Sequence, residues 1–218
     1  MSEFENHTSK RAIGDVSLAA GRAATQMGWY RFAAENFASG NDVLDVGCGL
    51  GEGLKELRRK AKTAQGQEID ENLNGEGIII GKIEQIKDKS FDVVISIDVV
   101  EHVPDDRNFV INLARIARKT LFLTTPLSAL GREIWPYHIR EYRPKELIDL
   151  VSDLGNVMYY KGTPSGSEIY PLKNMDFFWI TDRLINNSIT NIPFRAVQKL
   201  LPKKLRYNAH HAVKIDLA

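Results

Sequence analysis

Residues Val43-Leu-Asp-Val-Gly-Cys-Gly-Leu-Gly51 join an apolar run to a cluster of three glycines. The run from Asp42 to Val46 predicts a short strand that ends at the glycines, and Leu54, Leu57 and Ala61 then recur at helical spacing. The stretch therefore predicts a strand, a tight turn and a helix. Glycines at such a turn let the backbone approach a ligand closely, and the first amides of the helix point toward it.

An acidic residue stands at a useful distance from this turn. Residues 64–69 are predicted to form the second strand, and Glu68 near its end follows Gly47 by 21 residues. A carboxylate there can accept hydrogen bonds from both hydroxyls of a ribose. Glu52 occupies the position where a dinucleotide-binding fingerprint needs its third glycine, and it would place a negative charge beside a pyrophosphate. The pattern favours a nucleoside-like ligand with a cationic end.

The rest of the chain alternates strands and helices. Further strands are predicted at residues 77–80, 91–97, 120–125 and 157–160. One helix follows Pro104, and another begins at Pro144 and is expected to end at a left-handed cap on Gly155. This order predicts an α/β fold: a doubly wound, mostly parallel, Rossmann-like sheet with helices on both faces.

We expect residues 1–218 to form a single domain, with a core at about residues 29–162. Residues 164–208 break the alternation and predict a helical C-terminal addition, with an aromatic helix at 174–186 and a basic amphipathic segment at 193–206. Residues 212–217 alternate like a strand, which either returns to the edge of the sheet or forms a disordered tail. Residues 70–76 are too few for a crossover helix between the second and third strands.

Composition and charge exclude several classes of protein. The chain has 29 basic and 28 acidic residues among 218, so any nucleic-acid surface must be local. Cys48 is the only cysteine, which excludes an internal disulfide and a multi-thiolate zinc site and favours a reducing compartment. No apolar run approaches the roughly 20 residues that span a bilayer, so we expect a cytoplasmic protein with no transmembrane anchor.

Three motifs together identify a family: the glycine stretch at 43–51, Gly66-Gln-Glu-Ile-Asp70 and Phe91-Asp-Val-Val-Ile-Ser-Ile-Asp-Val-Val-Glu-His-Val103. In their order and spacing they resemble class I S-adenosylmethionine-dependent methyltransferases. The resemblance implies that the glycine loop and the residues after the second, third and fourth strands hold S-adenosylmethionine. Carried over by position, the cofactor residues are Asp45, Gly47, Cys48, Gly49, Glu68, Ile83, Glu84, Ile97 and Asp98. Lys82 stands where the family often has an aspartate for the adenine.

The flanking segments look like those of methyltransferases from bacterial polysaccharide and other small-molecule pathways: residues 29–34, 125–128 and 137–144. The implied acceptor is a hydroxyl of a saccharide or another small molecule. His138 lies in the loop after the fifth strand, where ligands bind in doubly wound folds, and its imidazole can act as the base that removes the hydroxyl proton. A structural histidine is the alternative.

Four aromatic residues flank the expected acceptor side: Trp29, Tyr30, Trp135 and Tyr137. They could stack on a sugar or close over the cofactor, and packing in the core is an equal alternative. Cys48 is best interpreted as a small residue that fits a tight loop, not as a nucleophile.

Asp98, Glu101 and His102 stand at positions i, i+3 and i+4 and would share one face of a helical turn. With His138 they form an alternative divalent-metal site, and the pattern resembles that of small-RNA 2′-O-methyltransferases and some ubiquinone-pathway O-methyltransferases. The preferred interpretation has no metal, with Glu101 and His102 facing the acceptor or serving the structure.

The basic segment near the C-terminus concentrates positive charge: Arg195, Lys199, Lys203, Lys204 and Arg206. It could bind a phosphate-bearing carrier, the surface of an anionic membrane or RNA, although a solvated helix face is the simplest interpretation. For the whole chain, a noncatalytic cofactor-binding protein with a regulatory or scaffold role is the alternative from another functional class.

Overall fold

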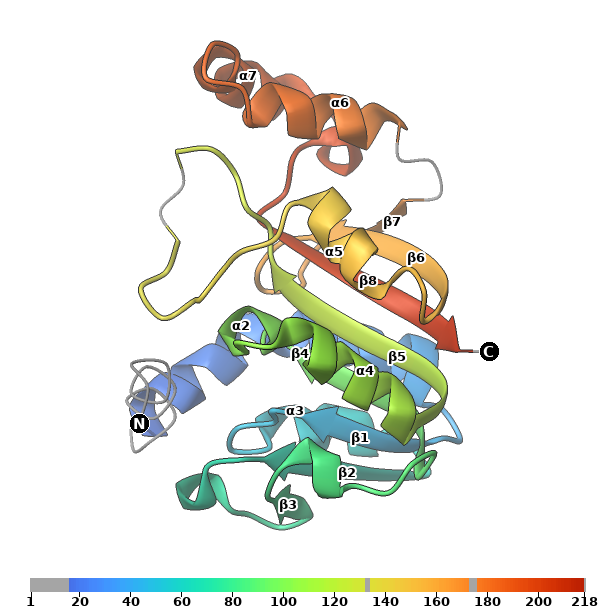
Figure 1. The fold of residues 1–218 in the computed structure, drawn as a ribbon. Helices are drawn as coiled ribbons and strands as arrows, with labels where there is room; N and C mark the ends of the chain where they lie inside the picture. Colours follow the sequence, from blue (N-terminus) through green and yellow to red (C-terminus); the bar gives the residue numbers. More distant parts are fainter. Residues whose placement is uncertain (1–15, 132–133, 173–175, 218) are drawn as a thin grey trace.

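The computed structural model describes residues 16–131, 134–172 and 176–217. Within them, strands form one eight-stranded sheet in the order β3-β2-β1-β4-β5-β8-β6-β7 (Figure 1). The strands are β1 (Asp42–Val46), β2 (Thr63–Glu68), β3 (Ile78–Ile80), β4 (Phe91–Ile97), β5 (Ala117–Pro126), β6 (Gly155–Gly162), β7 (Ile169–Leu172) and β8 (His210–Leu217). The α-helices are α2 (Val16–Ala33), α3 (Glu52–Arg58), α4 (Asp106–Ile116), α5 (Pro144–Val151), α6 (Asp176–Ile185) and α7 (Asn191–Val197).

The predicted Rossmann-like fold is confirmed. The five strands β3, β2, β1, β4 and β5 are parallel to one another. Strand β8 is antiparallel to both of its neighbours, β5 and β6. Strand β7 is antiparallel to β6. The strand order reverses between β1 and β4. Ligands of doubly wound sheets bind at such a reversal, beyond the carboxyl ends of the strands.

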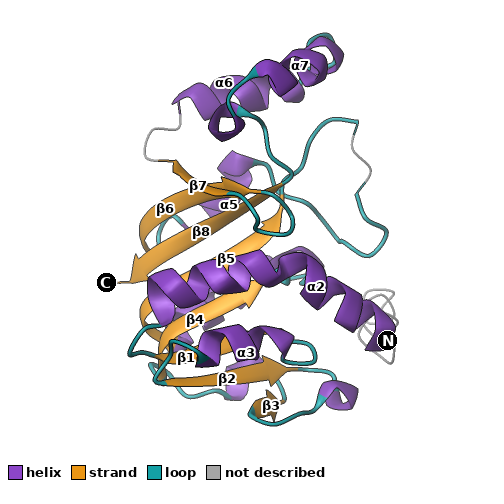
Figure 2. Ribbon diagram, turned by 180° about the vertical axis from the view of Figure 1, so that it is seen from behind, coloured by secondary structure: helices purple, strands orange, loops and turns teal. Residues whose placement is uncertain are grey.

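Helices cover the sheet on both sides. Helices α4 and α5 lie on the face that is in front in Figure 1, and α2 and α3 lie on the opposite face, which is in front in Figure 2. Neighbouring side chains of a strand point to opposite faces, so Leu44 packs with the first pair of helices and Val43 with the second. This double burial explains the continuous apolar runs in β1 and β4.

The short connection between β2 and β3 is confirmed. It contains one 3₁₀ turn, η2 (Glu71–Leu73), instead of a crossover helix. The helix expected after Pro104 begins at Asp106, where the side chain of Asp105 caps it by accepting a hydrogen bond from the Asn108 amide.

The predicted helix cap at Gly155 is wrong. Helix α5 ends at Val151 with Ser152 as its C-cap, and Gly155 is the first residue of β6. A Cβ atom on Gly155 would lie 2.3 Å from the carbonyl oxygen of Asp216 in β8. Glycine is needed at this position because two strands approach closely.

The C-terminal strand exists, but its predicted place at the sheet edge is wrong. Strand β8 lies inside the sheet between β5 and β6, and Ile215 pairs with Leu121 on one side and Val157 on the other. The alternative of a disordered tail is wrong as well. The edge is formed instead by β7, which the sequence pattern did not predict.

The C-terminal addition forms a lobe of residues 176–205, which stands at one end of the molecule (Figure 1). Its first helix, α6, matches the predicted aromatic helix, whose expected first residues, 174 and 175, lie outside the described residues. The predicted basic segment is divided into α7 and two 3₁₀ turns, η5 (Gln198–Leu200) and η6 (Lys203–Leu205). No helix in the described residues is long and apolar enough to cross a membrane.

Candidate active site

The glycine loop after β1 contains three left-handed residues. Gly47, Gly49 and Gly51 have φ angles of 74°, 57° and 73°. A Cβ atom on Gly47 would lie 2.5 Å from the side chain of Val99, so this glycine lets the loop pack against the turn that follows β4. A Cβ atom on Gly49 would meet no atom within 4 Å. Gly49 therefore faces open space at the strand reversal, where a ligand can reach the backbone.

Glu68 connects the second strand to this loop. Glu68 is only 8% exposed. Its carboxylate accepts hydrogen bonds from the amides of Gly49 at 2.9 Å and Ile69 at 2.7 Å. A carboxylate has about four lone-pair sites, so Glu68 keeps capacity for ribose hydroxyls. The next residue, Ile69, is 61% exposed and offers apolar surface beside that acid, a feature that sequence reasoning missed.

Asp45 and Cys48 lie beneath the loop surface. Asp45 is completely buried, and the Tyr30 hydroxyl lies close enough to its carboxylate to lower the pKa of that group. Burial, assisted by the charge of Glu68, raises the pKa of Asp45 to about 7. The Cys48 side chain occupies the space above Gly66, and burial raises the pKa of its thiol. Both residues support the loop from below.

Replacing Asp45 is expected to change the pH dependence of stability. Its pKa of about 7 in the folded chain lies above the value of about 3.9 for an unfolded aspartate. Between these values the folded chain keeps a proton that the unfolded chain loses, so this group lowers the free energy of unfolding as pH rises from about 4 to about 7. In Asp45→Asn the side chain does not titrate, so this fall in the free energy of unfolding with rising pH is absent.

In urea unfolding, the free energy of unfolding of Asp45→Asn relative to the unmodified chain should rise by about 2–3 kcal/mol between about pH 5 and pH 7.5. A difference between the two proteins that stays constant with pH would show that Asp45 is ionised throughout.

The short 3₁₀ turn η3 (Ile83–Gln85) follows β3 and carries the residues predicted to contact the cofactor there. Ile83 is buried, whereas Lys82 and Glu84 are exposed. Lys82 thus stands exposed at the position where the resembled family often has an aspartate for the adenine.

Asp98 follows β4 in a left-handed conformation with a φ of 55°. Its carboxylate accepts hydrogen bonds from His210 at 2.6 Å and from Gln26 at 2.8 Å, and it also bonds to the Thr124 hydroxyl. Burial opposes ionisation, but the charge of His210 and these hydrogen bonds outweigh it and hold the pKa of Asp98 below its ordinary value. Ile97, the preceding residue, is buried at the end of the strand.

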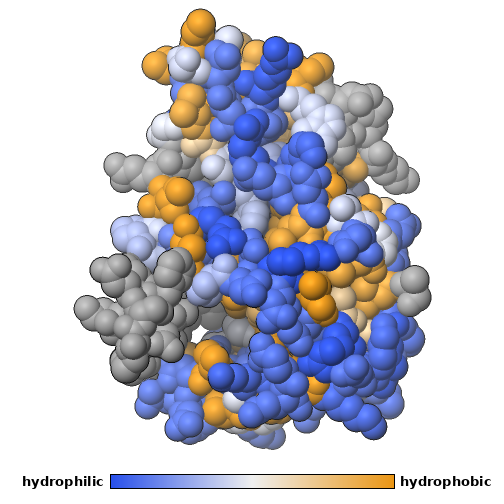
Figure 3. Space-filling model, in the orientation of Figure 1, coloured by the Kyte–Doolittle hydropathy of each residue, from blue (hydrophilic) through white to orange (hydrophobic). Residues whose placement is uncertain are grey.

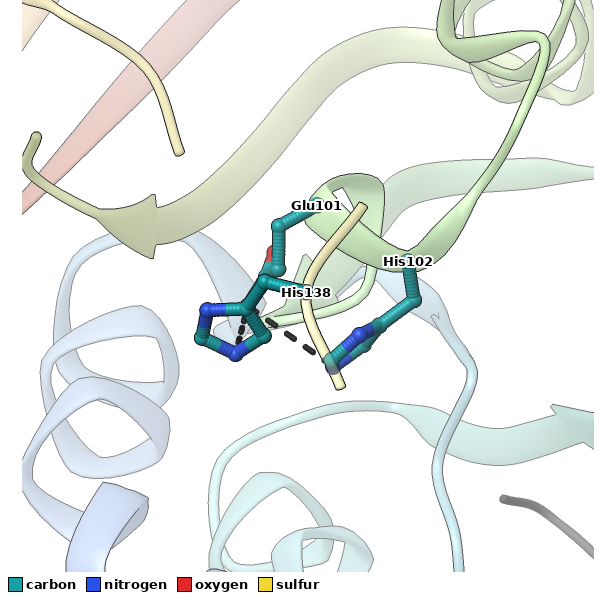
Figure 4. A group of neighbouring side chains, drawn as sticks. All are labelled: Glu101, His102 and His138. Atoms are coloured by element: carbon teal, nitrogen blue, oxygen red, sulfur yellow. Dashed lines mark ion pairs between the residues drawn. The ribbon is translucent and has the colours of Figure 1, made fainter. Parts of the chain in front are cut away.

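The predicted face shared by Asp98, Glu101 and His102 is wrong for Asp98. The 3₁₀ turn η4 covers only Val100–His102, so the left-handed Asp98 lies outside it. The structure instead brings Glu101, His102 and His138 together (Figure 4). One ligand atom from each lies within 4.8 Å of the others.

Fixed hydrogen bonds orient the two histidines of this cluster. Nδ1 of His138 lies 3.0 Å from Oε1 of Glu141, and Nδ1 of His102 lies 3.2 Å from the Tyr137 carbonyl oxygen. Both partners are acceptors, so each Nδ1 donates to its partner, and a neutral ring in this orientation has its lone pair on Nε2. Both Nε2 atoms lie 3.9 Å from Oε1 of the completely buried Glu101, whose other oxygen accepts a hydrogen bond from Thr125.

A cavity of about 160 Å³ adjoins this cluster, beyond the carboxyl ends of β4 and β5. It is lined by Gln26, Asp98, Glu101, Pro126, Trp135, His138, Pro164 and His210. Sequence reasoning missed Gln26 and His210, together with Glu141 behind His138. The paired histidines before the alternating C-terminal residues were the available signal for His210.

The four flanking aromatic residues divide into two groups. Trp29 and Tyr30 are 0% and 4% exposed and belong to the core, so the alternative of core packing holds for these two residues and stacking on a sugar does not. Trp135 and Tyr137 are 37% and 43% exposed and contact each other edge to face, and Trp135 also lines the cavity.

Comparison with known proteins agrees with this geometry. A family model described as a methyltransferase domain matches residues 21–158, more than half of the chain. The chain belongs to the S-adenosylmethionine-dependent methyltransferase family. A probable S-adenosylmethionine-dependent methyltransferase of Mycolicibacterium smegmatis is 30% identical over 134 residues, which are 54% of this chain and 52% of that protein. The match to this chain spans about half the length of the curated relatives.

Solved structures share the fold of this methyltransferase-family chain. A Thermotoga maritima protein described as a possible histamine N-methyltransferase aligns with a TM-score of 0.62 at 16% identity, covering 97% of this chain and 99% of that one. The magnesium protoporphyrin IX methyltransferase of Synechocystis, crystallised with S-adenosylhomocysteine, aligns with a TM-score of 0.56 at 14% identity, covering 98% and 94% of the two chains.

Proposed function

We propose that this protein is an S-adenosylmethionine-dependent O-methyltransferase whose acceptor is a hydroxyl of a saccharide or another small molecule. The observation that carries the proposal is the position of His138, which lines a cavity beyond the carboxyl ends of β4 and β5 with Nδ1 held by Glu141. We place the reaction in a cytoplasmic pathway of polysaccharide synthesis as part of the same proposal.

The residues around the glycine loop fit the cofactor. Gly49 leaves open space over the backbone, Glu68 can accept ribose hydroxyls, and Ile69 offers apolar surface to an adenine ring. When bound, S-adenosylmethionine supplies a methyl group on a sulfonium cation. The carboxylates of Asp98 and Glu101 at the cavity favour a positive charge beside it.

The cavity residues fit a hydroxyl acceptor. Nε2 of His138 is the ring atom that can take the hydroxyl proton, and Glu141 stabilises the resulting imidazolium through the Nδ1 hydrogen bond. The exposed ring of Trp135 can stack on a sugar, and the side-chain amide of Gln26 can bond to neighbouring hydroxyls. Holding the oxygen in line with the methyl group supplies much of the rate enhancement.

Labelled methyl transfer tests this function. The purified chain is incubated with S-adenosylmethionine labelled in the methyl group and with panels of monosaccharides, nucleotide sugars, phenols and amines. We expect the label in an ether carbon of a hydroxyl acceptor, identified by mass spectrometry and NMR. Transfer to nitrogen or carbon would contradict O-methylation, and saturable cofactor binding without transfer would support the noncatalytic alternative.

A second candidate function, metal-assisted O-methylation, is favoured by the cluster of Glu101, His102 and His138. Two neutral imidazoles and a carboxylate that converge within 4.8 Å make a set of ligands suited to a divalent transition metal. Both Nδ1 atoms bond to oxygen acceptors, as they do in metal-ligating histidines. A cation there would bind acceptor oxygens and lower their pKa, as a catechol-like quinone precursor or a terminal ribose of RNA would require.

Chelation separates the two candidates. If His138 acts as a base without metal, EDTA should leave the rate within about twofold, and His102→Ala should lower it less than His138→Ala does. Loss of activity in EDTA, restored by Mn²⁺, Co²⁺ or Zn²⁺ in the unmodified chain but not in His102→Ala, would instead establish the metal-assisted reaction. Lys87→Ala, a change at an exposed residue that belongs neither to the cluster nor to the lining of the cavity, is the control and should respond as the unmodified chain does.

A further inference from the structure

The lobe of residues 176–205 is fixed to the sheet through one side. Phe178 is buried and stacks on the ring of Tyr207 with a centroid distance of 5.6 Å. Asp182 accepts hydrogen bonds from Arg143 at 2.6 Å and from the Tyr207 hydroxyl at 3.0 Å. These contacts account for the side of the lobe that faces the domain, and they leave its outer side free of any role in the fold.

The outer side of the lobe is apolar. Leu200, Ile189 and Ile192 are 86%, 82% and 76% exposed, the highest values among the large apolar side chains of the described residues. Ile192 and Ala196 are four residues apart in α7 and share one face of that helix, and Leu200 ends the 3₁₀ turn η5 that follows. All three are exposed, while Phe194 is buried. Apolar residues accordingly appear at this end of the molecule in Figure 3. Several strongly exposed aliphatic side chains in one small lobe favour a binding surface there.

The same segment carries a strong positive charge. Residues 183–206 contain six basic residues and no acidic one, whereas the rest of the chain has 23 basic and 28 acidic residues, a net charge of −5. Lys199, Lys204 and Arg183 are exposed next to the apolar face in sequence. The cationic lobe thus differs in charge from the remainder of the protein.

We propose that the outer side of this lobe binds the surface of an anionic membrane. Apolar side chains rimmed by lysines match a bilayer of acidic lipids, because the apolar groups enter the acyl region while the ammonium groups stay at the phosphates. RNA complements the charge but offers no apolar environment for the three strongly exposed aliphatic side chains. The chain binds peripherally, through a surface and not through a spanning segment.

Membrane binding would act next to the cavity. The amide of Leu130 donates to Asn186 in the lobe at 2.8 Å, and Arg195 donates to the Leu130 carbonyl oxygen at 2.5 Å. Leu130 belongs to the loop that continues to Trp135 and His138 at the cavity. The bound lobe would hold this loop near the bilayer, so that a lipid-linked hydroxyl could reach His138. This last step rests on the proposed function, whereas membrane binding does not.

Vesicle flotation of the full chain tests the proposal. At about 0.1 M salt the chain should float with phosphatidylcholine vesicles that contain about 30% phosphatidylglycerol and not with pure phosphatidylcholine. Since one basic residue near such a surface contributes about fivefold in partitioning, Lys199→Glu with Lys204→Glu should weaken binding by about 25-fold or more. Ile192→Ser with Leu200→Ser should weaken binding by at least about tenfold.

Matched controls use exposed residues elsewhere. Ile111→Ser on α4, and Lys87→Glu with Lys89→Glu, should bind vesicles as the unmodified chain does. Retained binding of S-adenosylhomocysteine shows that each variant is folded. The proposal is overturned if the chain does not float with anionic vesicles, or if the lobe variants float with them as the unmodified chain does. It is also overturned if the chain binds RNA through the lobe and does not bind vesicles. Because flotation needs no methyl transfer, its failure is distinct from failure of the proposed activity.

Discussion

Gly49→Val is expected to weaken the binding of S-adenosylhomocysteine by at least about 100-fold, measured by calorimetric titration. The φ of 57° at Gly49 is unfavourable for a β-branched residue, and the new side chain would project into the open space above the loop. The Gly49 amide also holds Glu68 in place. The substitution should therefore disturb both the loop backbone and the carboxylate of Glu68 in the proposed cofactor site.

Gly40→Val is the matched control for Gly49→Val. Gly40 has a φ of 71°, and a Cβ atom there also meets no atom within 4 Å, but it lies before the amino end of β1, away from the ligand edge. Both variants should lose about 1–2 kcal/mol of stability from the left-handed backbone, and only Gly49→Val should lose the ligand. Normal binding by Gly49→Val would refute the cofactor site.

His138→Ala is expected to lower kcat by about 10²- to 10⁴-fold, the usual contribution of a general base, while leaving the affinity for S-adenosylhomocysteine unchanged. The side chain lines the cavity proposed for the acceptor and is not part of the glycine loop, so the loss should appear in transfer and not in cofactor binding. Single-turnover transfer and calorimetric titration measure the two effects separately.

Glu141→Gln checks the positioning role behind His138. The amide keeps an oxygen that can accept the Nδ1 hydrogen bond, but it removes the charge that stabilises an imidazolium, so kcat should fall by about tenfold with an altered pH–rate profile. If His138→Ala turns over normally, His138 is not the base, and the structural alternative for this histidine is correct.

The first half of the site could be predicted because its determinants are local. The strand, the glycine turn and the helix from Asp42 to Arg58 follow from apolar periodicity and from the conformational freedom of glycine. Glu68 follows as the acid that ends the neighbouring strand, and the hydrogen bond from Gly49 joins the two motifs. Strands and helices alternate along the sequence, and this order predicts a parallel sheet. The fold class could therefore also be predicted from the sequence.

The second half of the site depends on long-range pairing, which periodicity does not encode. Strand β8 enters between β5 and β6, and only this insertion brings His210 to Asp98, 112 residues away in the chain. Gln26 reaches the same carboxylate from α2. A helical-face argument failed at Asp98 because one left-handed residue is enough to take a side chain out of register.

Glycine and aromatic positions show the same limit. Gly155 was interpreted as a helix cap because local patterns favour glycine there, but the close approach of Asp216 explains it. For Trp29 the sequence left a role beside the acceptor and packing in the core open, and the core position follows from its burial and from its indole N–H, which donates to the Thr163 carbonyl oxygen. In both cases the deciding contact comes from a segment that is distant in sequence.

Thermal unfolding with and without S-adenosylhomocysteine tests the central claim most directly. A ligand at about 100 times its dissociation constant stabilises the native state by about 2.7 kcal/mol. For a chain of this size we predict a saturable rise in Tm of about 5–10 °C. No rise at millimolar ligand would contradict the account, because it would mean that the family's fold is present here without a cofactor pocket at Gly49 and Glu68.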